Sequence, residues 1–165
     1  MKAVSHEEAG VLRNHLGLVE SAEALDHHYY HWGSAGYEEG IFGVPACLSR
    51  IVLSHGPAIF YIRAMDIWRD MDHFMINAIG EAVAKTVLTN NQFLLVDSNE
   101  GDALASLIHL AMISGWDCEI YSTSTVKRCE IDHDGNLDLY SIGDRAIIVD
   151  EFKKMTGREL RSISQ

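Results

Sequence analysis

The chain has few of the residues that build disulfide scaffolds or disordered segments. Among its 165 residues are two prolines and three cysteines, and the cysteines form no CxxC pair. The scarcity of proline argues against disorder, and a sparse, odd set of cysteines suits a reducing compartment better than a disulfide framework. No apolar run approaches the roughly 20 residues of a membrane span, and the first residues lack the apolar stretch of a signal peptide. We therefore expect a cytoplasmic protein.

The common motifs of cofactor and substrate binding are also missing. The chain has neither the GxGxxG nor the GxxxxGK[ST] pattern of phosphate-binding loops, and it has no GxSxG nucleophile turn. No segment combines basic and aromatic residues in the way that nucleic-acid-binding surfaces do. These absences predict a protein without a cofactor and without direct contact to nucleic acid, and they favour a non-enzymatic protein while leaving an enzyme open.

Positive charge is missing from two long stretches. The formal net charge is −11 with histidines neutral, and no lysine or arginine lies between Arg13 and Arg50 or between Lys85 and Lys127. The acidic residues of these stretches are Glu20, Glu23, Asp26, Glu38, Glu39, Asp97, Glu100, Asp102, Asp117 and Glu119. Such a distribution repels nucleic acid and anionic lipid and attracts basic proteins or cations. The alternative is that the acidity only maintains solubility.

Hydrophobic periodicity and turn signals predict the helices. Ser5 and Glu8 have the spacing of a capping box, which starts a helix. Apolar residues at helical spacings, followed by glycines, indicate where the helices end. We expect helices over residues 5–16, 21–32, 45–55, 66–88 and 97–114.

The strand pattern predicts an α/β fold. Residues 58–62, 93–96 and 116–121 are rich in strand-forming residues, and strand, helix and strand over 93–121 match a βαβ unit with a parallel pair. Asp134-Gly135 between two alternating segments predicts a hairpin over 126–142 with a type I′ turn. Residues 146–156 fit either a helix or a strand. We expect one α/β domain over 1–165, with a helical N-terminal portion, a mixed sheet containing the βαβ unit, and the C-terminal hairpin.

The sequence DHHYYHW, residues 26–32, offers two interpretations. On a helix, His27 and His31 would be four residues apart and could hold one Zn²⁺ ion, with His55, His73 or a distant carboxylate as third ligand. Alternatively, an apolar stripe packs on the core and leaves both histidines in water. That stripe would be formed by Leu25, His28, Tyr29 and Trp32. We favour the amphipathic helix, since the catalytic glutamate of HExxH is missing.

A protein-contact surface is a further hypothesis for this region. Aromatic residues are enriched at binding hot spots, and acidic residues suit a basic partner. A glycine-rich loop over 33–43 follows the aromatic segment; it could equally be structural. The predicted partner-binding residues are Tyr30, Trp32, Tyr37, Glu38 and Glu39.

The carboxylates that follow residues 93–96 form a second candidate metal site. Asp97, Glu100 and Asp102 could hold Mg²⁺, which usually needs one or two carboxylates. The favoured alternative is that Asp97, Ser98 or Asn99 caps the next helix, with the remaining acids complementing its dipole.

These observations predict a small acidic cytoplasmic protein that inhibits or regulates a basic partner protein. The partner could be a toxin or nuclease, as for immunity proteins and antitoxins, because an acidic inhibitor associates faster with a basic enzyme. One alternative is a metal-dependent enzyme that uses Asp97 and its neighbours or the pair His27 and His31. Another is a homo-oligomeric structural protein without a ligand, for instance a homodimer.

Overall fold

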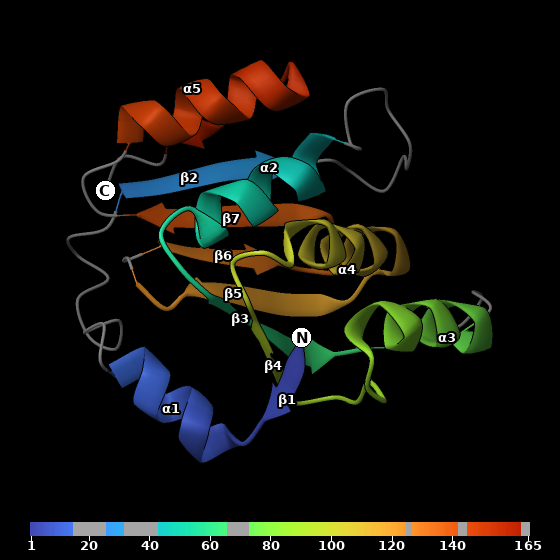
Figure 1. Ribbon diagram of the computed structural model, residues 1–165. Helices are drawn as coiled ribbons and strands as arrows, with labels where there is room; N and C mark the ends of the chain where they lie inside the picture. The colour runs from blue at the N-terminus through green and yellow to red at the C-terminus, as the bar shows by residue number, and fades with distance from the viewer. Residues whose placement is uncertain (15–25, 32–42, 66–72, 125–126, 142–144, 163–165) are drawn as a thin grey trace.

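The computed structural model describes residues 1–14, 26–31, 43–65, 73–124, 127–141 and 145–162 (Figure 1). In chain order its elements are β1 (Lys2–Val4), α1 (His6–Asn14), β2 (Asp26–His31), α2 (Gly43–Leu53), β3 (Ala58–Ala64), α3 (His73–Ala84), β4 (Gln92–Val96), α4 (Gly101–Ser114), β5 (Asp117–Ser122), β6 (Lys127–Ile131), β7 (Asn136–Ser141), α5 (Arg145–Thr156) and β8 (Arg161–Ser162). The fold is mixed α/β, as predicted. No described helix is long and apolar enough to cross a membrane.

The strands form one sheet in the order β1-β4-β3-β5-β6-β7-β2-β8, and all of its neighbouring strands are antiparallel. The prediction of a mixed sheet with a parallel βαβ pair is therefore wrong. Strands β4 and β5 do run in the same direction, because each is antiparallel to β3, but β3 lies between them. Local periodicity detects the strand, helix and strand but cannot show that an earlier strand is inserted between the two.

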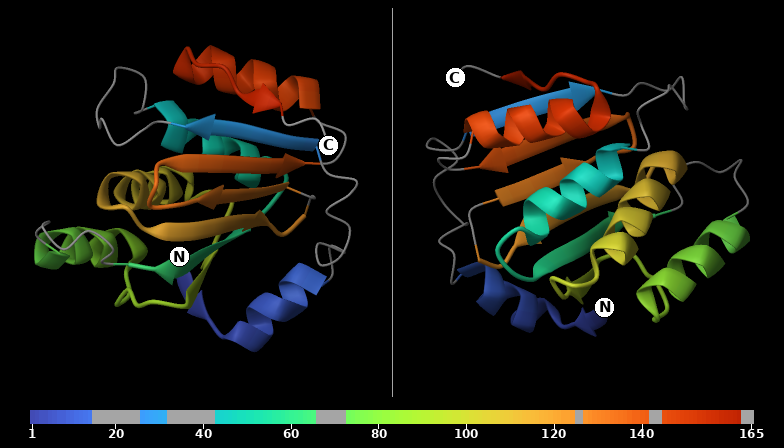
Figure 2. Two further views of the ribbon diagram at one scale, coloured as in Figure 1. Left: turned by 180° about the vertical axis from the view of Figure 1, so that it is seen from behind. Right: turned by 45° about the horizontal axis from the view of Figure 1, so that its top comes forward.

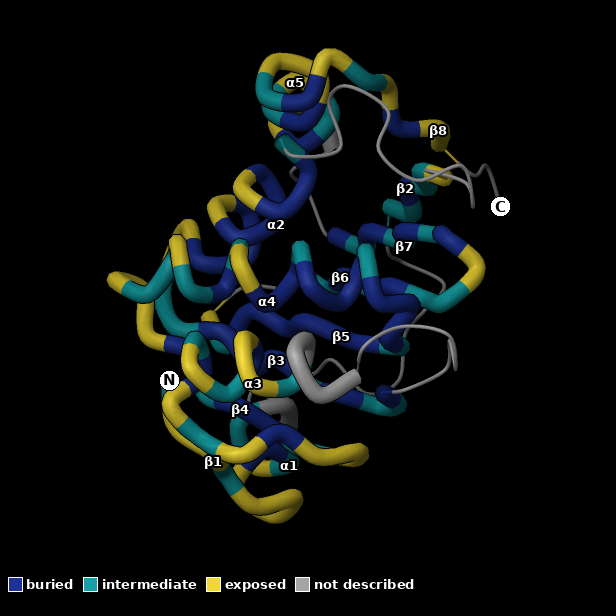
Figure 3. The backbone as a smooth tube through the Cα atoms, turned by 90° about the vertical axis from the view of Figure 1, so that its right-hand side faces the viewer, coloured by how far each residue is buried: buried dark blue, intermediate teal, exposed yellow. Residues whose placement is uncertain are grey.

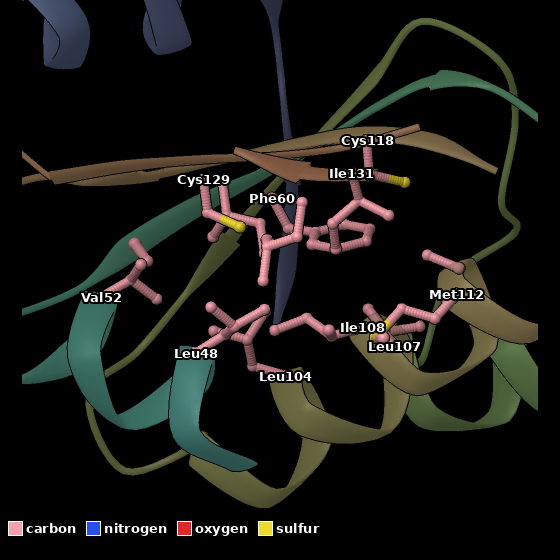
Figure 4. Close-up of a cluster of buried hydrophobic side chains, with 14 of the residues drawn as sticks. Leu48, Val52, Phe60, Leu104, Leu107, Ile108, Met112, Cys118, Cys129 and Ile131 are labelled. Atoms are coloured by element: carbon pink, nitrogen blue, oxygen red, sulfur yellow. The ribbon is translucent and has the colours of Figure 1, made fainter. Parts of the chain in front are cut away.

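Four helices and one face of the sheet enclose the main core. Helices α2, α3, α4 and α5 lie on the same side of the sheet (Figures 1 and 2). Side chains of α2 and α4, such as Leu48 and Leu104, point towards Phe60 of β3 and Cys129 of β6 (Figure 4). Helix α1 lies on the opposite face, where Ala9 packs with a smaller cluster of buried residues. This second cluster also contains Ile59, Phe93 and Tyr121.

The N-terminal helix is confirmed over its described part. The Ser5 amide donates to Glu8 Oε2 at 2.8 Å, and the Glu8 amide donates to Ser5 Oγ at 3.1 Å, which is the predicted capping box. The expected second helix is wrong over residues 26–31, which form β2, so the N-terminal portion is not helical throughout. Strand β2 pairs with β7 along its whole length, and this long-range pairing outweighs a weak local helical pattern.

The C-terminal hairpin is confirmed as β6 and β7, but its turn differs from the expected type I′. Four residues, 132–135, connect the strands, and among them only Gly135 has a positive φ, of 84°. The Gly135 amide donates to the Asp132 carbonyl at 3.3 Å, as in longer hairpin loops that end in a left-handed glycine. The ambiguous segment 146–156 is helical and belongs to α5.

Candidate functional site

Part of the sheet carries polar side chains on the face away from α2–α5. In Figure 2 (left), strands β5, β6, β7 and β2 are seen from this side, and no described helix crosses them. The outward side chains are Tyr61 and Arg63 of β3, Glu119 and Tyr121 of β5, Arg128 and Glu130 of β6, Asp138 and Tyr140 of β7, and His27, Tyr29 and His31 of β2. We call this surface the polar sheet face.

The polar sheet face arises from strict alternation in the hairpin. In β6, Cys129 and Ile131 are buried on the helix side, so Arg128 and Glu130 must point outward. Strand β7 alternates in the same way between buried and half-buried residues. Figure 3 shows this alternation along β6 and β7 as changes between buried and intermediate segments.

Three carboxylates lie side by side in one row across the face. Glu119 is directly opposite Glu130, and Glu130 is directly opposite Asp138. Tyr61 and Tyr29 are the next cross-strand partners at the two ends of this row. Like charges directly opposite each other destabilise a sheet, so the row needs compensating positive charge.

The adjacent row contains stacked rings and a guanidinium. In register across the strands lie Tyr121, Arg128, Tyr140 and His27. The Arg128 guanidinium carbon lies 5.5 Å from the Tyr121 ring centroid and 5.7 Å from that of Tyr140, within the range of cation–π contacts. The rings of His27 and Tyr140 are stacked, with centroids 4.5 Å apart and planes 14° apart.

Ion pairs join the two rows. Arg128 Nη2 lies 2.5 Å from Glu130 Oε1 and 3.3 Å from Glu119 Oε2, so one guanidinium bridges two opposed carboxylates. Arg63 Nη1 lies 3.3 Å from the other oxygen of Glu119. His27 Nε2 lies 2.5 Å from Asp138 Oδ1. Glu119 is thus held by two guanidiniums. Among the described residues, Glu130 is contacted by one guanidinium and Asp138 by the imidazole of His27.

Burial of this network disfavours the charge on Glu130. Desolvation raises the pKa of the Glu130 carboxyl, Arg128 opposes that rise, and Glu119 adds to it. Burial also raises the pKa of Tyr140 to about 12, so its ring remains neutral at physiological pH. Ionised Glu130 therefore costs folding free energy at neutral pH, and perturbed carboxyls of this kind are concentrated at functional sites.

We predict that Glu130→Gln does not lower the melting temperature at pH 7 and raises it slightly. A carboxyl whose pKa is raised on folding is penalised above that folded pKa, and the penalty disappears as the pH falls below the unfolded pKa, about 4.3. The difference between variant and wild type should therefore shrink from pH 7 towards pH 4. Thermal melts across this range measure it.

Glu8→Gln is the control with the opposite sign. The Ser5 amide and hydroxyl lower the pKa of the Glu8 carboxyl. Its contribution to stability is present at neutral pH and is lost as the pH falls through the folded pKa. The Glu8 variant should melt below wild type at pH 7 and converge with it in acid. If the Glu130 variant behaves like the Glu8 variant, the ionised Glu130 carboxylate does not destabilise the folded protein, and the raised pKa of Glu130 is contradicted.

The predicted partner-binding residues lie mostly outside the described residues. This applies to Trp32, Tyr37, Glu38 and Glu39. Tyr30 is described and lies on the helix side of β2, half-buried, with its ring edge-on to Phe152 at a centroid distance of 5.4 Å. It therefore faces the opposite side of the sheet from the polar sheet face.

His27 and His31 do not have the arrangement that a shared metal ion requires. His27 and His31 point to one side, but on a strand they are separated by about 13 Å along the chain, too far to share one ion. His27 contacts Asp138, and His31 Nδ1 lies 2.9 Å from Asn136 Oδ1. Among the residues that the structure describes, no group of three histidines, cysteines or acids is placed to hold a metal.

The acids around the start of α4 match the prediction only in part, because Asp102 lies in the first turn of α4, where it complements the helix dipole. Asp97 and Asp102 are exposed, and Glu100 occupies the N-cap position without a side-chain cap bond. The Glu100 carboxylate instead accepts from the Asp97 amide at 3.0 Å and contacts the amino group of Met1. The expected capping by residues 97–99 is therefore wrong.

The possible nucleophiles show no activated arrangement in the described part of the chain. All three cysteines are buried and unpaired, and burial raises the pKa of Cys47 to about 12. Ser54 Oγ lies 2.7 Å from His55 Nδ1 and accepts from Lys127 Nζ at 3.1 Å, but its proton goes to the Ile51 carbonyl at 2.9 Å. This hydroxyl bond is a local contact to the last turn of helix α2.

Sequence reasoning overlooked the residues at the centre of the polar sheet face. Arg128, Glu130, Asp138 and Tyr140 all belong to the correctly predicted hairpin, and each is an outward residue of its alternating pattern. The outward positions of the alternating pattern are polar in both strands, and this observation alone would have placed the four residues on one surface.

Comparisons with protein-family models, curated proteins and solved structures found no match.

Proposed function

We propose that the protein is a small acidic binding protein of the cytoplasm that inhibits or regulates a basic partner protein, such as a toxin or nuclease. This is the role of immunity proteins and antitoxins. The net charge of −11 would steer a basic partner towards the chain and repel nucleic acid and anionic membranes. Three buried, unpaired cysteines suit a reducing compartment.

The observation that carries the proposal is the polar sheet face. It combines carboxylates with the rings of Tyr29, Tyr140 and His27, on strands that a rigid hydrophobic core holds in place. Aromatic side chains commonly provide the dissociation-limiting contacts of an interface, and surrounding charges set the association rate. Trp32, Tyr37, Glu38 and Glu39 remain predicted contacts of the same partner, whereas Tyr30 packs on Phe152 at the helix side of the sheet and is not part of this surface.

Affinity capture from the native host, followed by kinetics with the identified partner, tests this proposal. We expect a partner with net positive charge, whose association rate falls steeply as ionic strength rises towards physiological values, because charge steering is screened by salt. An acidic partner, or association that is indifferent to salt, would contradict the proposal. Recovery of only a second copy of this chain would favour the homo-oligomeric alternative.

A further inference from the structure

We propose that Glu130 and Asp138 form the specific recognition point of the polar sheet face, and that they receive an arginine side chain of the partner. This inference depends on the proposed function, because it names the chemistry that the binding surface recognises. The group that binds there is the guanidinium of an arginine in a basic protein segment.

The face itself provides the template for this contact. Glu119 and Glu130 are directly opposed on β5 and β6, and the Arg128 guanidinium bridges them. Glu130 and Asp138 are opposed in the same way on β6 and β7. Within the described residues, no guanidinium bridges this second pair. An arginine from a partner could therefore make there the contact that Arg128 makes one strand away.

Glu130 and Asp138 each have one carboxylate oxygen that can accept a hydrogen bond from a ligand. Arg128 contacts Glu130 through Oε1, and His27 contacts Asp138 through Oδ1. The other oxygens, Glu130 Oε2 and Asp138 Oδ2, have no hydrogen-bond or ion-pair partner among the described residues. The two side chains are 22% and 26% exposed, compared with 9% for Glu119, so a ligand can reach them more easily.

The local charge also favours an additional cation. Two arginines, Arg63 and Arg128, contact the row of three carboxylates, so the carboxylates outnumber the guanidiniums by one. A planar guanidinium suits two opposed carboxylates better than an ammonium group, since its donors are fixed in a fork. Tyr29, directly opposite Asp138, adds a ring beside the site on which a guanidinium can stack.

The test compares labelled hexa-arginine and hexa-lysine peptides by fluorescence anisotropy at physiological ionic strength. We expect wild type to bind hexa-arginine about fivefold more tightly than hexa-lysine. The double variant Glu130→Gln/Asp138→Asn should lose about tenfold in affinity for hexa-arginine and most of the preference for arginine.

Asp97→Asn/Asp102→Asn is the matched control, because it changes the net charge equally at two exposed positions, one before α4 and one in its first turn. It should bind hexa-arginine within about twofold of wild type. An equal loss in the two double variants, or equal affinity of wild type for the two peptides, would overturn the inference. Thermal melts verify folding, and Glu130→Gln alone gives a second variant that should also weaken the arginine preference.

Failure of the inference can be separated from failure of the proposed function. A captured basic partner that binds wild type and Glu130→Gln/Asp138→Asn equally would refute the arginine site and leave the binding function supported. A clear preference for hexa-arginine without any basic partner in the native host would refute the function and support the site.

Discussion

Replacing Phe152 by alanine should lower the free energy of unfolding by about 3–5 kcal/mol, as expected for truncation of a fully buried aromatic side chain. Phe152 is 0% exposed and belongs to the main core. It connects α5 to β2 through its edge-on contact with Tyr30. The measurement is chemical denaturation, with the free energy extrapolated to water.

The matched control is Ile147→Ala on the same helix. Ile147 is 65% exposed, so its truncation removes little buried area and should change stability by less than about 0.5 kcal/mol. If both variants lose similar free energy, α5 does not pack on the sheet through the face that contains Phe152.

Gly43→Ala should destabilise the protein by about 1–3 kcal/mol, the range for overpacking a close contact. A Cβ atom at Gly43 would lie 2.6 Å from the Met155 carbonyl oxygen and 3.3 Å from the Thr156 Cα. Both are backbone atoms of α5, so relief requires that α2 and α5 move apart. Chemical denaturation again measures the effect.

Gly10→Ala in α1 is the control with the opposite sign. A Cβ atom at Gly10 would meet nothing within 4 Å, and alanine is the better helix former by about 1 kcal/mol. This variant should therefore be as stable as wild type or more so. Destabilisation by Gly10→Ala, or tolerance of Gly43→Ala, would contradict the positions of α1 and α2 described above.

Local sequence signals predicted those elements whose pattern depends on near neighbours. The capping box at Ser5 and Glu8, the stripe of α4 and the hairpin around Gly135 all follow from residues close in sequence. Strand β2 was misjudged because its three histidines and two tyrosines have no strong apolar period. Its conformation is decided by β7, more than 100 residues later, as the contact between His27 and Asp138 shows.

The same difference between local signals and long-range pairing explains which parts of the candidate site could be predicted from the sequence. The outward positions of Arg128, Glu130, Asp138 and Tyr140 could be predicted from alternation within the hairpin alone. Their partners could not, because the stacking of His27 on Tyr140 requires the long-range pairing of β2 with β7. The alternative of a shared histidine metal site fails for a related reason, since residues four apart are close on a helix and far apart on a strand.

The central claim is that the polar sheet face binds a basic protein, and photo-cross-linking tests it most directly. A photoreactive residue replaces either His31, exposed at the end of β2 on this face, or Val87, which follows α3 and is 64% exposed. With the identified partner, we predict an efficient cross-link from position 31 and little or none from position 87. Cross-linking from position 87 alone, or equally from both positions, would contradict the assignment of the binding surface.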